Sequence, residues 1–177
     1  MSYDIYLKDP VSEETIEIDE PHFMRGGTYK LGGNTELWLN ITYNYGCYYR
    51  EASKGDLRFG EDGGIRGIYG KTGAESVPML EDLISRIENR YKKDGEWIVT
   101  KRDRFRYFDS IGKEIDYGDA LGKLLRGEKV YEKEYSIEIS EGPNDDYWED
   151  TAGNAIRPLY QLIAFAKMRP DGIWDGD

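Results

Sequence analysis

Few side chains in this 177-residue chain could do catalytic chemistry. His22 is the only histidine and Cys47 the only cysteine, so a Cys–His nucleophile would depend on the fold to join them. Imidazole titrates near neutral pH and can act as a general base, but no GxSxG, HExxH, Walker or GxGxxG motif accompanies it. We therefore expect His22 to be a hydrogen-bonded loop residue, and we predict no catalytic residue, no cofactor and no metal site.

A glycine-rich segment, residues 60–73, is the one candidate for phosphate binding. Lys71 and Thr72 precede a predicted helix, and the N-terminus of a helix attracts anions. The Walker spacing fails, because Ile65 stands five residues before Gly70, where glycine is required. We therefore expect these glycines to form turns.

An alternative function, binding or conversion of a nucleotide-like small molecule, stays open. In that reading Arg25 and Arg66 hold an anion, and Trp38 or Tyr43 stacks on a ring. A change of melting temperature with nucleotides would favour this alternative, because a bound ligand stabilises the folded state.

The charge of the chain favours a basic partner. Acidic side chains outnumber basic ones by 35 to 24, a net charge of −11 with histidine neutral. Acids concentrate in residues 1–20 and 132–150, whereas residues 86–106 are basic. Because phosphate binding depends on Lys and Arg, this charge disfavours direct nucleic-acid binding and favours a basic protein, such as one that itself binds nucleic acid. A solvated surface with no partner explains the same charge.

Aromatic side chains are the second sign of a binding surface. The chain has fifteen tyrosines and four tryptophans, and Tyr43, Tyr45, Tyr48 and Tyr49 cannot all face inward on one strand. Tyr, Trp and Arg contribute most to binding hot spots. The predicted partner- or ligand-binding residues are Arg25, Tyr29, Trp38, Asn40, Asn44, Arg66, Tyr69, Glu132, Glu134, Asp145 and Asp146.

Apolar periodicity predicts the elements that must position these residues. Two alternating segments near the N-terminus, which we expect to form a hairpin, and four later ones predict the strands 3–8, 15–19, 36–45, 96–100, 104–109 and 130–139. In 36–45, alternation places Leu37 in the core and Trp38, Asn40 and Asn44 on the opposite row. Helical spacing predicts helices over 74–92, capped by Thr72 and Glu75, over 119–126, and over 150–168, where Pro158 kinks or restarts the helix.

These elements predict an α+β fold, with a mostly antiparallel sheet packed by two amphipathic helices. Residues 1–93 and 141–177 form the expected core domain, and residues 94–140 an inserted β-rich subdomain. The sequence has no apolar run long enough to cross a membrane and no signal-peptide pattern at its start. With a single cysteine, the cytoplasm is the expected compartment.

Three parts of the chain resemble a poorly characterised family of small proteins encoded by bacteriophages and prophages. They are residues 21–29 (PHFMRGGTY), residues 36–46 with 67–76, and residues 157–177. The resemblance implies a mobile-element gene acting in the bacterial host's cytoplasm, and it carries over no functional residue. Together with the charge and the aromatic residues, it predicts a non-enzymatic binding protein that blocks or sequesters a host factor, such as a defence nuclease, in the manner of an anti-CRISPR inhibitor. A virion or structural component is a third possibility.

Overall fold

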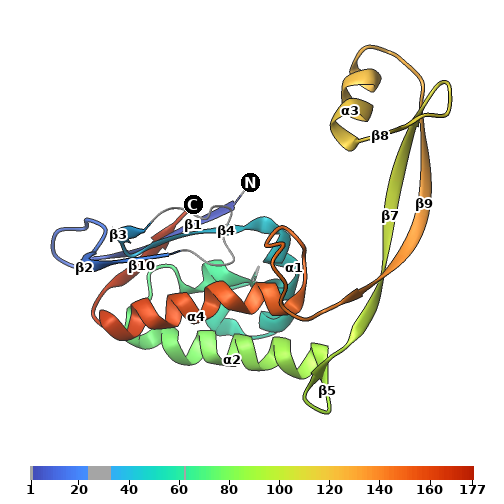
Figure 1. Cartoon of the computed structure of the whole chain (residues 1–177). Coiled ribbons are helices and arrows are strands. Elements are labelled where there is room, and N and C mark those ends of the chain that lie inside the picture. Colours follow the sequence, from blue (N-terminus) through green and yellow to red (C-terminus); the bar gives the residue numbers. More distant parts are fainter. Residues whose placement is uncertain (1, 24–32, 62) are drawn as a thin grey trace. The chain divides into compact units, whose positions relative to one another are not determined.

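The computed structural model describes residues 2–23, 33–61 and 63–177 (Figure 1). Internal contacts divide the chain into two compact units, and we describe each by itself: unit 1 comprises Met1–Ile98 with Glu141–Asp177, and unit 2 comprises Val99–Ser140. Helices and antiparallel strands both occur among the described residues. This confirms the predicted α+β class.

The central strand of unit 1 is β1 (Ser2–Lys8), where a strand was predicted. It pairs antiparallel with β4 (Trp38–Thr42) along one edge and with β10 (Ile173–Gly176) along the other. Alternation turns Ile5 and Leu7 toward the core, and both are fully buried.

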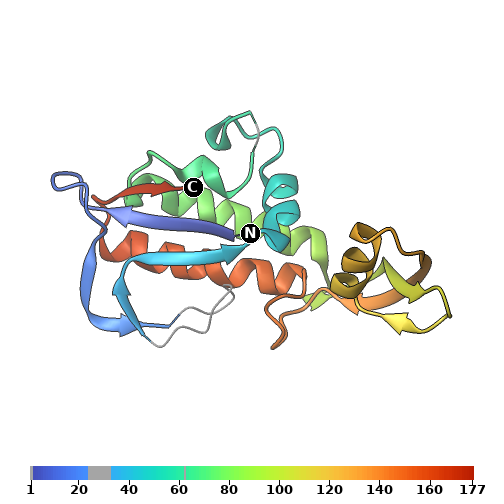
Figure 2. The same cartoon turned by 90° about the horizontal axis from the view of Figure 1, so that it is seen from above.

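Two long helices cover one face of this sheet (Figures 1 and 2). α2 (Gly73–Tyr91) confirms the amphipathic helix predicted there, and Thr72 with Glu75 forms the predicted capping box. α4 (Ala152–Met168) continues through Pro158 without a break, so the predicted restart is wrong. The two helices pack against each other, and both contribute residues to the hydrophobic core.

The C-terminal tail, for which no element was predicted, contributes strand β10 (Ile173–Gly176). Trp174 lies in this strand and is buried, and its Nε1–H donates to Ser76 Oγ at 2.7 Å. The strand has only four residues and pairs with the other end of the chain, so periodicity could not reveal it.

The hairpin predicted for the first twenty residues forms only at its turn. Lys8 is bridged to Thr15, and Ile16 N donates to Leu7 O at 2.9 Å, but β2 (Glu17–His22) then pairs with β3 (Asn34–Glu36). The second arm does not continue along β1, because β10 occupies one edge of that strand and β4 pairs with residues 2–6 on the other. His22, expected in a loop, is the last residue of β2.

The strand predicted over 36–45 ends early. Thr42 Oγ1 accepts from Asn44 N at 3.3 Å and begins the 3₁₀ helix η1 (Tyr43–Tyr45), and the helix α1 (Gly46–Ser53) follows it. Neither helix was predicted. Because the chain coils here, three of the four clustered tyrosines are buried after all: Tyr45, Tyr48 and Tyr49.

Short elements complete unit 1, namely η2 (Leu57–Phe59), η3 (Ile65–Ile68), β5 (Lys92–Lys93) and β6 (Glu96–Trp97). The glycine-rich segment thus contains the 3₁₀ turn η3, and η2 lies just before it. None of the helices formed by the described residues has the length and apolar character needed to cross a membrane.

Unit 2 is built on a ribbon of two long strands, β7 (Val99–Asp109) and β9 (Val130–Ser140), paired antiparallel along their whole length. β7 continues through the gap between the strands predicted at 96–100 and 104–109, because β9 offers it an unbroken ladder. β8 (Glu114–Ile115) pairs with the end of β7. The following helix, α3 (Tyr117–Leu125), confirms the helix predicted there.

Candidate functional site

The predicted binding residues do not gather in one place. Arg25 and Tyr29 lie outside the described residues. In β4, Trp38 Nε1–H and Asn40 Nδ2–H both donate to Asp4 Oδ1, at 3.2 and 2.7 Å. Asn40 is buried. The row that alternation offered as a recognition surface is therefore bonded within the sheet, and Asn40 is not accessible to a partner.

Asn44, expected in the same row, lies in η1 and contacts the loop that precedes α4. Its Nδ2–H donates to Trp148 O at 2.8 Å. In that loop, Asp146 Oδ1 accepts from Trp148 N at 3.0 Å, and Asp146 O accepts from Asn154 Nδ2 at 3.0 Å. Asp145 is exposed beside them. Asn44 thus fastens the loop to η1, and Asp146 fastens it to α4, so both have structural roles.

Arg66 and Tyr69 come close together in unit 1. Arg66 Nε–H donates to Asp177 O at 2.7 Å, and its Nη2–H donates to Tyr43 Oη at 3.0 Å. Tyr69 Oη lies 3.5 Å from the same Asp177 oxygen. Burial raises the pKa of Tyr69 well above its ordinary value, so the phenol stays protonated near neutral pH.

Arg66 also lines a pocket of about 380 Å³, which we call the arginine pocket. Tyr3 of β1 and Arg50 of α1 form part of its wall, and the other described lining residues lie in 59–61 and 63–67. Neither Tyr3 nor Arg50 was predicted as a site residue. Tyr3 and Arg50 lie far apart in the sequence. The glycine-rich segment was the only sequence motif that drew attention to this part of unit 1.

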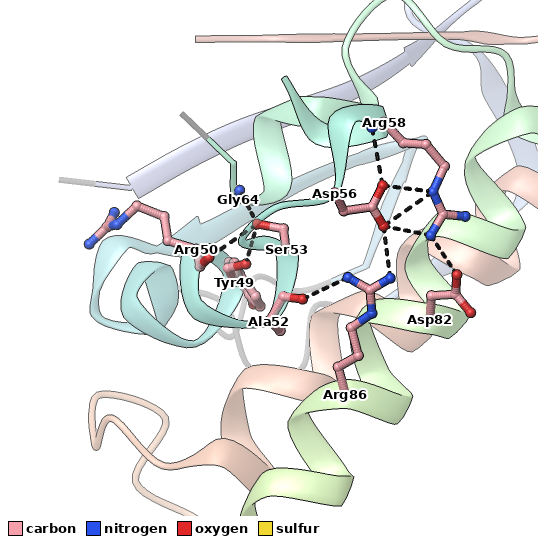
Figure 3. A network of polar contacts seen from close by, with 9 residues as sticks. All are labelled: Tyr49, Arg50, Ala52, Ser53, Asp56, Arg58, Gly64, Asp82 and Arg86. Carbon is pink, nitrogen blue, oxygen red and sulfur yellow. Dashed lines mark hydrogen bonds and ion pairs between the residues drawn. The ribbon is translucent and has the colours of Figure 1, made fainter. Parts of the chain in front are cut away.

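Two polar clusters hold the walls of the arginine pocket (Figure 3). Ser53 Oγ accepts from Gly64 N at 2.6 Å, which ties the end of α1 to the glycine-rich segment. Asp56 accepts from Arg58 Nη2 at 2.6 Å and from Arg86 Nη2 at 2.8 Å. The bond to Arg58 is the main reason why the pKa of Asp56 lies far below its usual range, so this carboxylate stays ionised.

Unit 2 carries an apolar stripe on α3. The stripe has four members, and the last three follow the first by four, seven and eight residues, so all four share one side of the helix. All are exposed, and they are Tyr117, Leu121, Leu124 and Leu125. Among the apolar residues of unit 2, only Ala120 and Ile139 are buried, and the hydrophobic core cluster contains no residue of 99–140.

The ribbon of unit 2 has faces of opposite charge. Residues directly opposite each other in an antiparallel pair share a face, and the register sets Glu132 opposite Tyr107 and Glu134 opposite Phe105. The two glutamates are exposed on this acidic face. Its charged members are Lys101, Asp103, Asp109, Glu132, Glu134 and Glu138. Those of the other face are Arg102, Arg104, Arg106 and Lys133.

Within the described ranges, no three His, Cys, Asp or Glu side chains are grouped so that they could hold a metal ion. Comparison of the chain with protein-family models, curated proteins and solved structures found no match. The α3 stripe and the arginine pocket are thus the two features from which a function can be argued.

Proposed function

We propose that this protein is a non-enzymatic binding protein that recognises another protein through the α3 stripe of unit 2. The exposure of four large side chains on one side of a short helix carries this proposal. An amphipathic helix normally turns its apolar side toward a core. Contiguous apolar surface left open on a folded domain is typical of an interaction site.

The folding of unit 2 does not account for the exposed leucines. The unit is held by the backbone ladder between β7 and β9, and Leu124 and Leu125 remain exposed in it. Full burial of one leucine side chain contributes about 1.5–3 kcal/mol. A partner's surface would supply the burial that unit 2 itself does not.

The charge distribution favours a basic partner over a second copy of the chain. Unit 2 has nine basic and nine acidic side chains, so the whole net charge of −11 belongs to unit 1. Two such units repel each other, whereas a basic protein is attracted at long range and binds faster. The partner we propose has a basic surface and an apolar groove that accepts one side of a helix.

A nucleic-acid-binding protein of a bacterial host has this chemistry. Binding to it would block or sequester it, which is the function expected from the sequence. A narrower prediction from the sequence is inhibition of a defence nuclease. Identification of the partner would test it.

Capture from a bacterial lysate with matched variants tests the proposal. Leu125 in α3 is 81% exposed and Leu57 in η2 is 90% exposed, so Leu125→Glu and Leu57→Glu make the same change without entering the core. We expect L57E to recover the same basic protein as the unchanged chain and L125E to lose it. Added salt should weaken the capture, because salt screens the attraction.

Two results would contradict the proposal. One is that L125E, shown by circular dichroism to be folded, recovers everything that the unchanged chain recovers. The other is that the chain captures only further copies of itself, with light scattering showing a dimer that L125E dissociates. The second result would assign the stripe to self-association.

A further inference from the structure

We infer that the arginine pocket of unit 1 binds the phosphate group of a small phosphorylated molecule, through Tyr3, Arg50 and Arg66. The site is separate from the α3 stripe, because all its lining residues belong to unit 1. The inference therefore does not depend on the proposed partner protein.

Tyr3 supplies a hydroxyl to the wall of the pocket. The residue is only 8% exposed, and its ring packs edge-on against Tyr43 with 4.4 Å between ring centres. No hydrogen bond joins Tyr3 Oη to another residue that the structure describes, and the tyrosine lines the pocket. Burial raises the pKa of Tyr3. The phenol therefore stays protonated and can donate a hydrogen bond to an anion.

Arg50 brings an uncommitted guanidinium to the same place. Its side chain extends away from the Asp56 cluster (Figure 3), and it makes no ion pair with the residues that the structure describes. A Cβ built on Gly46 would lie 2.6 Å from Tyr3 Oη and 3.1 Å from Arg50 Nη1. The two donors therefore lie close to one point, and a side chain at position 46 would push Tyr3 Oη away from it.

Arg66 completes the positive end of the pocket. Its guanidinium carbon lies 5.3 Å from the centre of the Tyr3 ring. Its Nε–H and Nη2–H are bonded to Asp177 O and Tyr43 Oη, and these contacts hold the guanidinium in place at the pocket. Paired guanidinium groups suit phosphate, because each can donate two parallel hydrogen bonds to its oxygens.

The walls are fixed before any ligand binds. The bond from Gly64 N to Ser53 Oγ joins the two sides of the pocket, and Gly64 has a φ of +84°, which favours glycine. A Cβ at Gly64 would lie 3.3 Å from Arg50 Cγ, so the glycine also lets the arginine stem lie against the loop. Such preorganisation lowers the entropy lost on binding.

The size and charge of the pocket define the ligand class. A volume of about 380 Å³ is at the lower end of small-molecule sites and exceeds what one phosphate ion fills. Among the lining residues that the structure describes there is one carboxylate, Glu61, and there are two arginines. A phosphate monoester fits this arrangement, with its phosphate at the arginines and its remainder toward Phe59 and Gly60.

Thermal shift and calorimetry with three probes test the inference: inorganic phosphate, adenosine monophosphate, and adenosine, which lacks the phosphate. We expect both phosphates, but not adenosine, to raise the melting temperature above that in sodium chloride of equal ionic strength. Arg50→Gln and Tyr3→Phe should each weaken the binding of adenosine monophosphate, R50Q by about tenfold or more, because each loses a hydrogen bond to a charged group. Arg126→Gln, which removes a like charge from unit 2, should bind as the unchanged chain does.

The inference is overturned if neither phosphate shifts the melting temperature at about 10 mM, where a millimolar site would be mostly filled. It is also overturned if folded R50Q and Y3F bind adenosine monophosphate as tightly as the unchanged chain. Loss of binding in R126Q to the same extent as in R50Q would show that only overall charge matters, which again contradicts a built site.

Discussion

Replacing unit 2 by a two-residue turn should leave unit 1 folded. Val99 pairs with Ser140 at the base of the ribbon, and Glu141 N donates to Ile98 O at 2.9 Å just before it. Opposite residues in such a pair have their Cα atoms about 4.5–5.5 Å apart, so an Asn-Gly turn can join Ile98 to Glu141. The change removes residues 99–140 and no member of the hydrophobic core cluster.

The size of the effect follows from loop closure. Shortening a 42-residue connection to two residues lowers its closure cost by about 3 kcal/mol. This is an upper limit, because pairing of β7 with β9 already orders the connection in the full chain. We therefore expect the free energy of unfolding of unit 1 to rise by at most about 3 kcal/mol and to fall by no more than about 1 kcal/mol.

Tryptophan fluorescence in urea measures this directly, because all four tryptophans lie in unit 1. The full chain and the shortened variant should both unfold in one cooperative transition with similar midpoints. A loss of more than about 1 kcal/mol, or the absence of a cooperative transition, would refute the reasoning, because unit 1 would then depend on unit 2 for its stability.

Three further predictions concern unit 1. Ser53→Ala should cost about 1–3 kcal/mol in urea unfolding, because Gly64 N loses its buried acceptor; a cost near zero would contradict the tie between α1 and the loop. Trp174→Ala should cost about 3–5 kcal/mol by circular dichroism, because a large buried side chain is removed, and a cost below about 1 kcal/mol would argue against β10. The pKa of Asp56 is lowered in the folded state, chiefly by Arg58, so its contribution to stability is present above the unfolded pKa of about 3.9 and is lost as the pH falls below it. Stability measured from pH 6 to pH 2 should therefore fall less steeply in Asp56→Asn than in the unchanged chain; identical slopes would show that the ion pairs contribute nothing.

Elements with strong local signals were predicted well. α2 has a capping box at Thr72 and Glu75 and an apolar stripe at helical spacing, so every signal lies within the helix itself. The same spacing predicted α3. The exposure of Leu124 and Leu125 could not be predicted, because it depends on the absence of an opposing core in unit 2.

Elements that depend on distant contacts were missed. α1 has no helical apolar pattern. It is held by two long-range hydrogen bonds: Tyr48 Oη donates to Glu141 Oε2, which is 93 residues away, and Tyr49 Oη donates to Ala155 O, which is 106 residues away. The arginine pocket was missed for the same reason. Its donors come from β1, α1 and η3, and no local motif connects them.

Photocrosslinking from the α3 stripe tests the central claim most directly. A photoreactive amino acid is placed at Leu125, and at Leu57 in a control chain, and both are irradiated in bacterial cells; the two positions are similarly exposed. We predict an adduct between Leu125 and a basic bacterial protein, and no such adduct from Leu57. No adduct from Leu125, or only one with the mass of two copies of this chain, would contradict the claim.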